Sequence, residues 1–418
     1  MTKILILGGG FGGIRVALDL ESKLGKRGDT KITLIDRNNS QTFHPSLYEV
    51  ASIYGVNHEH PYHTKLRGTI CIPFSKIFKG KKVEFVQAEI NHIDLQAKHV
   101  VTNGGAVIEF DYLVLAFGSI VSTFGTPGVE EYAFKFKTIE NALMLNDKIE
   151  QLFIEASENK RSLPINILIG GAGFNGIELA AEFSNCAVHV AHRHAIAQPN
   201  CAAITLIEAT PAILPMVSDK ERKIIEKRLK KLGINILTNS PIEEVGPDYV
   251  KIKNGDVLSG DLIVWTAGVK TLDLFKGISG LELDDRGRIF ANEFLQTKNH
   301  TNIFAIGDNI VFIDPKTQKP IPQMAFLAIE QGRVAAENII RLINSKMQLK
   351  KYEPDYDIWI APVGGKYALV HLNGYNFSGL LGYIAREVVD LRYFLSVLPL
   401  FEAIKLFFED ARVFSRND

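Results

Sequence analysis

Two glycine-rich segments, each followed by an acidic residue, have the residue types and spacing that bind a diphosphate. Residues 8–13 read GGGFGG and residues 171–176 read GAGFNG, so both fit the pattern GxGxxG, and each follows an apolar run. The first glycine permits a tight turn, the second admits a pyrophosphate to the backbone, and the third allows close helix–strand packing. Free N–H groups at the start of the following helix hold the phosphates. The sequence therefore predicts two dinucleotide sites, lined by Gly8, Gly10, Phe11, Gly12 and Gly13 in one and by Gly171, Gly173 and Gly176 in the other.

The acidic residues point to the sugar next to each diphosphate. Asp36 ends the apolar stretch 32–36, and Glu208 ends the similar stretch 204–208. A carboxylate at this place accepts hydrogen bonds from ribose hydroxyls and repels a 2′-phosphate, so Glu208 favours NADH over NADPH. Glu208 follows Gly176 by 32 residues, whereas about 20 is usual.

The elements that must position these residues form a repeated pattern of strand, helix and strand. The apolar strands are typical of a parallel sheet that is covered on both faces. We expect an α/β fold with two Rossmann-like domains, the second inserted in the first, and a C-terminal amphipathic helical element. The expected boundaries are 1–122 and 271–365 for the first domain, 123–270 for the second, and 366–418 for the C-terminal region. Three more apolar strands end in small or acidic residues and add Ala116, Gly118, Gly268, Gly307 and Asp308 to the candidate site.

The composition excludes several other classes of protein. Lys and Arg together number 47, as do Asp and Glu, which gives no general attraction to nucleic acid. Three cysteines without a CxxC pair predict neither a disulfide framework nor a zinc ribbon, and fit a reducing compartment. Two groups of histidines lack the spacing of metal ligands, so no metal site is expected. They are His58, His60 and His63, and His189, His192 and His194.

Over roughly residues 1–340, the sequence resembles the flavoproteins with two dinucleotide-binding domains, and specifically the type II NADH dehydrogenases, which are NADH:quinone oxidoreductases. The resemblance is carried by the two glycine motifs with Asp36 and by the segments 43–51, 112–119, 124–129 with 137–138, and 307–308. It implies that the first motif holds FAD, with Asp36 at the adenosine ribose, Asp308 near the ribityl–phosphate region and Pro45 in the same site. It also implies that the second motif holds NADH, and that Glu178 lies close to the flavin and nicotinamide as a catalytic residue. A helix-start carboxylate favoured by the helix dipole is the alternative for Glu178.

The expected electron acceptor is a quinone, although the sequence departs from the family pattern in the segment expected beside the quinone. The family carries an Ala-Gln-x-Ala-x-Gln-Gln-Gly pattern near flavin and quinone, and residues 325–332 read AFLAIEQG. We expect Ala325 beside the cofactor, Phe326 and Gln331 beside the quinone, and Glu330 as a proton donor with a raised pKa. The alternative for Glu330 is an ordinary solvated helix residue.

Residues 42–50 contain none of the cysteines that disulfide reductases and NADH peroxidases need beside the flavin. Sulfide:quinone oxidoreductases need cysteines flanking the flavin, and Cys186 and Cys201 fall within the second nucleotide unit instead. Cys71 remains a candidate thiol, for which packing is the more ordinary role.

The C-terminal region is apolar but interrupted by charges. A spanning helix needs about 20 predominantly apolar residues, and the charge-free run 393–401 is too short and contains Pro399. Two amphipathic helices broken near Pro399 are expected to attach the protein to a membrane surface, as the resemblance implies for the cytoplasmic face. The alternatives are packing on the protein's own domains and a homodimer interface.

Three hypotheses for function follow. The first is a monotopic NADH:quinone oxidoreductase that does not pump protons. The second is a soluble NADH-dependent flavoenzyme with a protein or oxygen acceptor. The third is a redox-sensing flavoprotein with little turnover.

Overall fold

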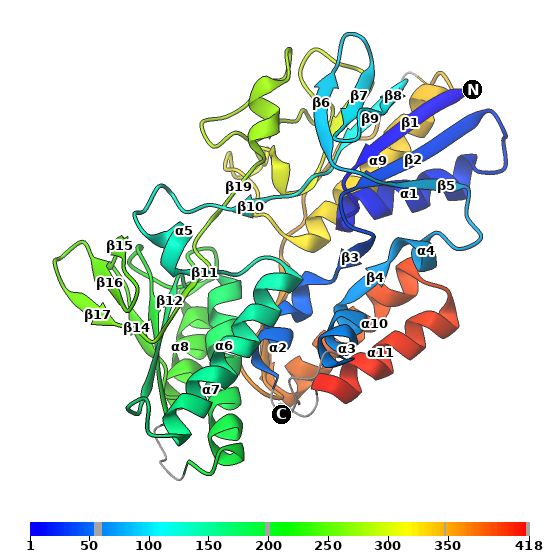
Figure 1. The fold of residues 1–418 in the computed structure, drawn as a ribbon. Helices are drawn as coiled ribbons and strands as arrows, with labels where there is room; N and C mark the ends of the chain where they lie inside the picture. Colours follow the sequence, from blue (N-terminus) through cyan, green and yellow to red (C-terminus); the bar gives the residue numbers. More distant parts are fainter. Residues whose placement is uncertain (54–60, 197–200, 347, 415–418) are drawn as a thin grey trace.

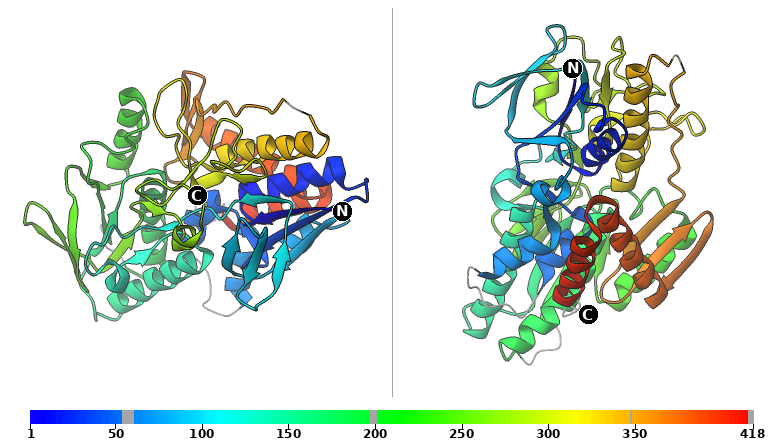
Figure 2. Two further views of the ribbon diagram at one scale, coloured as in Figure 1. Left: turned by 90° about the horizontal axis from the view of Figure 1, so that it is seen from above. Right: turned by 90° about the vertical axis from the view of Figure 1, so that its right-hand side faces the viewer.

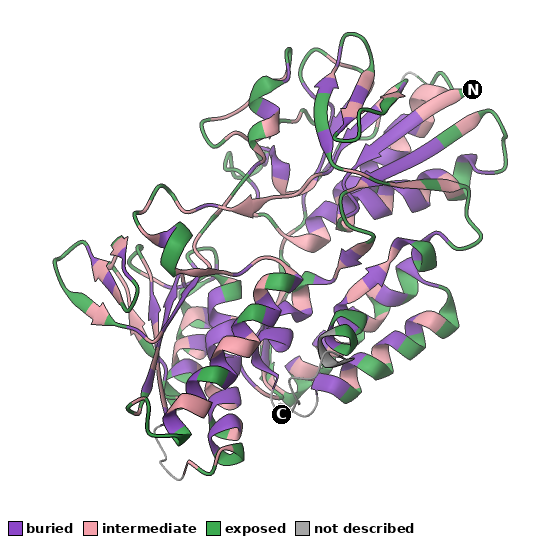
Figure 3. Cartoon of the chain, viewed as in Figure 1, coloured by how far each residue is buried: buried purple, intermediate pink, exposed green. Residues whose placement is uncertain are grey.

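Two parallel sheets, each covered by helices, make up most of the molecule (Figure 1). The computed structural model describes residues 1–53, 61–196, 201–346 and 348–414. His58 and His60 lie outside these residues. The buried residues concentrate in the strands and on the helix faces against them, as expected for strands with long apolar runs (Figure 3).

The first sheet has the strand order β21-β9-β1-β2-β5, and all of its strands are parallel. Helices α1 and α9 lie side by side against it. Their backbones approach so closely that a side chain at Gly332 would meet the backbone oxygen of Gly12 at 2.7 Å. The strands are β1 (Thr2–Leu7), β2 (Thr30–Asp36), β5 (Val83–Gln87), β9 (Tyr112–Leu115) and β21 (Ile303–Ala305), and the helices are α1 (Phe11–Leu24) and α9 (Ala325–Ile343).

The second sheet repeats this plan with the order β11-β18-β12-β13-β14, again all parallel. Helix α6 begins with a capping box between Thr138 and Asn141, and α8 with one between Ser218 and Glu221. The strands are β11 (Phe134–Lys135), β12 (Ile165–Gly170), β13 (Ala202–Ile207), β14 (Asn235–Leu237) and β18 (Leu262–Trp265), and the helices are α6 (Ile139–Ser157), α7 (Phe174–Arg193) and α8 (Asp219–Lys231).

The chain passes between the two sheets through a pair of short strands, β10 (Ile120–Val121) and β19 (Val269–Lys270), which pair antiparallel. One strand leaves the first sheet and the other returns toward it, so the second sheet is built from an insertion in the first unit. Asn254-Gly255 lies in the turn of a hairpin, in which β16 (Tyr249–Ile252) pairs antiparallel with β17 (Val257–Ser259).

The remaining short elements surround these sheets. They include the antiparallel strands β3 (Ser40–Thr42) and β4 (Cys71–Pro73), β6 (Ile90–Asp94), β7 (His99–Thr102) and β8 (Val107–Glu109), and β15 (Ile242–Val245), and the parallel pair β20 (Ile289–Phe290) and β22 (Ile310–Val311). The short helices are η1 (His44–Ser46), α2 (Leu47–Ser52), α3 (Pro61–Ile70), α4 (Phe74–Ile77), α5 (Val129–Tyr132), η2 (Asp273–Gly277) and η3 (Gly307–Asn309).

The C-terminal region forms a three-stranded antiparallel sheet followed by two helices (Figure 2). Its elements are β23 (Ile358–Pro362), β24 (Ala368–Leu372), β25 (Tyr375–Gly379), α10 (Leu380–Val397) and α11 (Leu400–Phe414). The sheet begins at Ile358, ahead of the expected start of this region at residue 366, because β23 pairs with β24. The two helices meet at Pro399, as expected. The predicted fold class, with two Rossmann-like units and a C-terminal helical element, is confirmed.

Candidate functional site

The first glycine turn connects β1 to α1 and leaves space above the start of the helix. Gly8 has a φ of +107°, and a side chain there would lie 2.2 Å from the backbone oxygen of Ala116. A side chain at Gly13 would lie 1.9 Å from the backbone oxygen of Gly8, so only glycine fits. Gly10, the N-cap of α1, differs: a Cβ there would meet no protein atom within 4 Å. Gly10 therefore faces the open side, where the N–H groups of the first turn are free to bind phosphate.

Asp36 ties the end of β2 back to this turn. Its carboxylate accepts hydrogen bonds from the backbone N–H groups of Gly9 at 2.7 Å and Asn38 at 2.8 Å. Burial raises the pKa of Asp36 even though these hydrogen bonds favour the charged form. The carboxylate is thus fixed beside the glycine turn.

The second glycine turn has the same construction between β12 and α7. Gly171 has a φ of +103°, a side chain at Gly176 would lie 2.0 Å from the backbone oxygen of Gly171, and Gly173 is open. Glu208 accepts hydrogen bonds from the backbone N–H groups of Ala172 at 2.8 Å and Thr210 at 2.9 Å. Each bond of Asp36 therefore has a counterpart at Glu208.

The long interval between Gly176 and Glu208 has a simple structural origin. Helix α7 has 20 residues whereas α1 has 14, and the connection to the next strand is also longer. The strand register is the same in the two units, because Gly170 lies opposite Ile207 just as Leu7 lies opposite Ile35. Glu208 thus occupies the position of Asp36 in its own unit.

A third group of candidate residues lies where β9 and β21 end side by side. The hydroxyl of Ser119 donates to Asp308 at 2.7 Å, and Lys137 donates to Ser119 at 3.1 Å and lies 3.6 Å from Asp308. Gly118 has a φ of +71° and open space above it, and its N–H donates to Asn309. The N–H of Gly307 donates to the buried amide of Gln331 at 2.6 Å. Gln331 therefore holds this turn in the structure, and Ser119 and Lys137 join the site although the sequence did not single them out as site residues.

The segment around Pro45 lies near the same group. Pro45 is in η1, and the Nδ1 of the adjacent His44 lies 3.0 Å from the backbone oxygen of Thr42.

The remaining candidate residues lie at helix starts, against the core or on the surface. Phe11 and Ala325 begin α1 and α9, Gly12 packs against Ile306 and α9, and Phe326 is half-buried against the core. Gly268 lies under the ring of Phe124 next to β19. The Glu330 side chain is 47% exposed and pairs with Arg333 at 2.5 Å. This is the geometry of the solvated helix residue given above as the alternative for Glu330, not of a desolvated proton donor.

Glu178 belongs to a buried group of charges that we call the Arg386 cluster: Glu49, Glu178, Arg386, Asp390 and Asp410. Arg386 donates to Glu49 at 2.6 Å and to Ser46 at 3.1 Å, and lies 3.5 Å from Asp390. Burial raises the pKa of Glu178 to about 8 and that of Asp390 to about 7, and it also raises the pKa of Asp410. The cluster therefore retains protons at neutral pH, because burial disfavours the charged form of these three carboxyl groups.

One feature of the sequence of helix α10 could have indicated this cluster. Arg386 and Asp390 stand four residues apart in a largely apolar helix, and both are about 95% buried. Charged side chains are seldom buried unless they are paired. The partner of Arg386, Glu49, lies 337 positions earlier, so the sequence did not indicate it.

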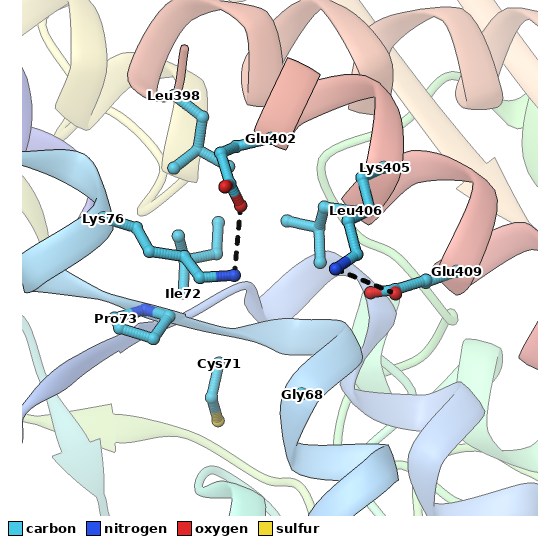
Figure 4. Close-up of a pocket in the computed structure, with 10 residues that line it drawn as sticks. All are labelled: Gly68, Cys71, Ile72, Pro73, Lys76, Leu398, Glu402, Lys405, Leu406 and Glu409. Carbon is cyan, nitrogen blue, oxygen red and sulfur yellow. Dashed lines mark ion pairs between the residues drawn. The ribbon is translucent and has the colours of Figure 1, made fainter. Parts of the chain in front are cut away.

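Cys71 lines a pocket between β4 and α11 (Figure 4). Lys76 and Glu402 form an ion pair of 3.2 Å across this pocket, and the Cys71 sulfur points away from it. Burial raises the pKa of the Cys71 thiol, which disfavours the reactive thiolate.

Comparison with known proteins identifies the family. Residues 2–332 match the family described as pyridine nucleotide-disulphide oxidoreductase. The type II NADH:quinone oxidoreductase of Staphylococcus epidermidis is 32% identical over 397 residues, covering 93% of this chain and 94% of the relative. The chain belongs to the type II NADH:quinone oxidoreductases.

The chain is also similar to a second relative and to two solved structures. The Staphylococcus aureus enzyme of the same name is 31% identical over 93% of this chain and 94% of its own length. The structure of NDH2 from Plasmodium falciparum in complex with NADH has a TM-score of 0.82, 18% identity and 99% coverage of both chains. The sulfide:quinone oxidoreductase of Aquifex aeolicus has a TM-score of 0.77 and 20% identity, covering 96% of this chain and 94% of its own. These two solved structures share the fold.

Proposed function

We propose that this chain oxidises NADH through bound FAD and passes the two electrons to a quinone, without pumping protons. The observation that carries the proposal is the paired construction of the two glycine turns, each closed by a carboxylate, in a chain that is 32% identical to a type II NADH:quinone oxidoreductase over 93% of its length.

The first turn fits the FAD diphosphate. The open position at Gly10 and the N-terminus of α1 would hold the phosphates, and Asp36 would accept the hydroxyls of the adenosine ribose. Ser119, Lys137 and Asp308 supply hydroxyl, cationic and anionic groups at the strand ends beyond it. When bound, FAD supplies the chemistry of accepting a hydride and releasing electrons to a quinone.

The second turn fits NADH. Gly173 and the start of α7 would hold its diphosphate, and Glu208 would accept the 2′-hydroxyl of its ribose. A 2′-phosphate beside this carboxylate would be repelled, so NADPH is the poorer substrate. Glu178 stands at the start of the same helix and, with a pKa of about 8, carries a proton at neutral pH. We assign Glu178 the role of supplying that proton during turnover.

Access to a lipid-soluble quinone is the proposed task of the C-terminal helices. In the described residues, no helix has the length and apolar character to cross a bilayer. Large apolar side chains of both helices are nevertheless exposed, among them Leu380, Leu381, Ile384, Val388, Leu400, Phe401, Ile404 and Phe408. Burying four such side chains at the acyl boundary would contribute ~6–12 kcal/mol before ordering costs. We place the protein peripherally on the cytoplasmic face of a membrane, and a second copy covering the same apolar surface is the competing arrangement.

Anaerobic reduction tests this function. NADH should bleach the flavin absorbance of the purified protein, and a short-chain quinone should then restore it within the time of steady-state turnover. A flavin that NADH reduces but the quinone leaves reduced would contradict the acceptor and favour a reductase with a protein or oxygen acceptor. Very slow reduction with a persistent charge-transfer band would favour the redox sensor.

A further inference from the structure

The C-terminal sheet is docked onto the NADH-binding unit through two contacts. Arg228 of α8 donates to the backbone oxygens of Val363 at 3.0 Å and Gly364 at 2.7 Å. The N–H of Gly365 donates to Glu182 of α7 at 2.9 Å. The turn between β23 and β24 is therefore fixed against the two helices that follow the second glycine turn (Figure 2).

His371 of β24 forms the third contact with this unit. Its Nδ1 bonds to the carboxylate of Glu221 in α8, and its Nε2 lies 2.8 Å from Asp357, just before β23. Glu221 and Asp357 are the charged groups that face His371 in the described part of the chain. The N–H of Gly374 lies 3.3 Å from Nε2 and can donate to it only when His371 is neutral. Burial opposes protonation of His371, but the hydrogen bonds to Glu221 and Asp357 outweigh it and raise the pKa of His371.

An aromatic stack leads from His371 to the start of the NADH-binding helix. The imidazole is parallel to the Trp359 ring, with centroids 5.5 Å apart and planes at 6°. The Trp359 ring also contacts the ring of Phe174, with centroids 5.7 Å apart and planes at 57°. Phe174 is the first residue of α7 and directly follows Gly173, the open position of the second glycine turn.

We propose that His371 and Trp359 are positioning residues for NADH. A protonated His371, held between two carboxylates, stacks on Trp359 and keeps it against Phe174, so that the first turn of α7 is fixed for the diphosphate. A cation stacked on an indole is favoured over a neutral imidazole. This inference rests on the proposed binding of NADH at the second glycine turn.

The sign of the pH dependence follows from the carboxylate pairing. The contact is complete while His371 is protonated and weakens as pH rises through its raised pKa, which lies above the ordinary value of 6.5. The KM for NADH should therefore increase in this alkaline range, and this increase should depend on His371. A fall in kcat near pH 8 would come from Glu178 and should be the same in the parent protein and in His371→Gln, because the stack touches neither the flavin turn nor the reacting atoms.

Tryptophan fluorescence tests the stack without NADH. The chain has two tryptophans, Trp265 and Trp359, and a stacked imidazolium quenches an indole. Emission of the FAD-loaded protein should rise with pH above 6.5, and this rise should vanish in His371→Gln and in Trp359→Phe. In His92→Gln, a control at an exposed histidine, the rise should persist.

Kinetics test the link to NADH. His371→Gln should raise the KM for NADH about two- to fivefold at pH 6.5, the factor expected from one cation–π contact, and flatten its pH dependence. Trp359→Phe, which keeps a ring, should retain more of the NADH affinity than Trp359→Ala. A pH-independent emission, or an unchanged KM in His371→Gln, would overturn the proposal. Failure of NADH to reduce the flavin of the unaltered protein would instead refute the proposed function, since the fluorescence test does not depend on it.

Discussion

Glu208 and Asp36 have the same structural role. Each carboxylate accepts a hydrogen bond from the backbone N–H group of the second residue of its glycine turn, Ala172 or Gly9. The residue types and their place at the ends of apolar strands singled out both residues in the sequence, but their hydrogen bonds to the glycine turns were not predicted. The distance of 32 residues from Gly176 was the misleading feature, and the added length of α7 explains most of it.

Removing the charge of Glu208 should change the choice of nucleotide. Glu208→Gln keeps the shape and one acceptor oxygen but no longer repels a 2′-phosphate. We expect the ratio of kcat/KM for NADH to that for NADPH to fall about tenfold, which corresponds to ~1.4 kcal/mol. Glu244→Gln, on the outlying strand β15, is the control. An unchanged ratio would mean that another residue distinguishes the two nucleotides.

Glu178 should make the stability of the protein depend on pH. Its pKa is raised to about 8 in the folded state, so between pH 4.5 and 8 the unfolded chain releases a proton that the folded chain keeps. The free energy of unfolding should therefore fall as pH rises through this range. In Glu178→Gln the fall should be smaller in urea titrations, whereas the exposed Glu89→Gln should behave as the parent protein does. Equal slopes in all three proteins would argue against a protonated Glu178.

Helix α10 could be predicted from the sequence, but the partners of its buried side could not. Its apolar periodicity and the break at Pro399 predict two helices, and the structure has both. The side of α10 that faces inward carries Arg386 and Asp390, and Arg386 pairs with Glu49 of α2. Contacts between segments more than 300 residues apart depend on the packing of whole domains, and no local pattern encodes them.

The Arg386–Glu49 pair gives a prediction about stability. Arg386→Met keeps the length of the side chain but leaves the buried Glu49 without its cation. We expect a loss of about 3–5 kcal/mol in the free energy of unfolding at pH 7.

A second variant separates charge from packing at this pair. The double change Glu49→Gln with Arg386→Met should recover part of the stability, because no unpaired charge remains at position 49. If the double variant is as unstable as Arg386→Met alone, the loss comes from packing.

In the whole molecule, the C-terminal region contacts both nucleotide-binding units and also carries a surface of exposed apolar side chains. Its sheet contacts α7 and α8, and α10 contacts η1 and α2. The sequence indicated an attached amphipathic element, but the docking of the sheet on the second unit depends on tertiary contacts that only the structure gives.

Membrane attachment through this region is testable with vesicles. Replacing Leu381 and Phe401, which are 68% and 86% exposed, with serine should reduce co-sedimentation with phospholipid vesicles while leaving NADH oxidation with a water-soluble quinone intact. Undiminished vesicle binding would contradict the assignment. Loss of a dimer on sizing, without any change in vesicle binding, would show that a second copy covers this surface.

The central claim is that one glycine turn holds FAD and the other holds NADH, and a matched pair of variants tests it. Gly10 and Gly173 both have φ values near −75°, which other residues adopt, and both face open space, so valine at either position obstructs the diphosphate without straining the backbone. The measurement is the flavin content of each purified variant, followed by its absorbance after anaerobic addition of NADH. Gly10→Val should be nearly colourless, whereas Gly173→Val should keep its flavin and be reduced by NADH far more slowly than the parent protein. A Gly10→Val protein that retains full flavin, or a Gly173→Val protein that NADH reduces at the normal rate, would contradict this account.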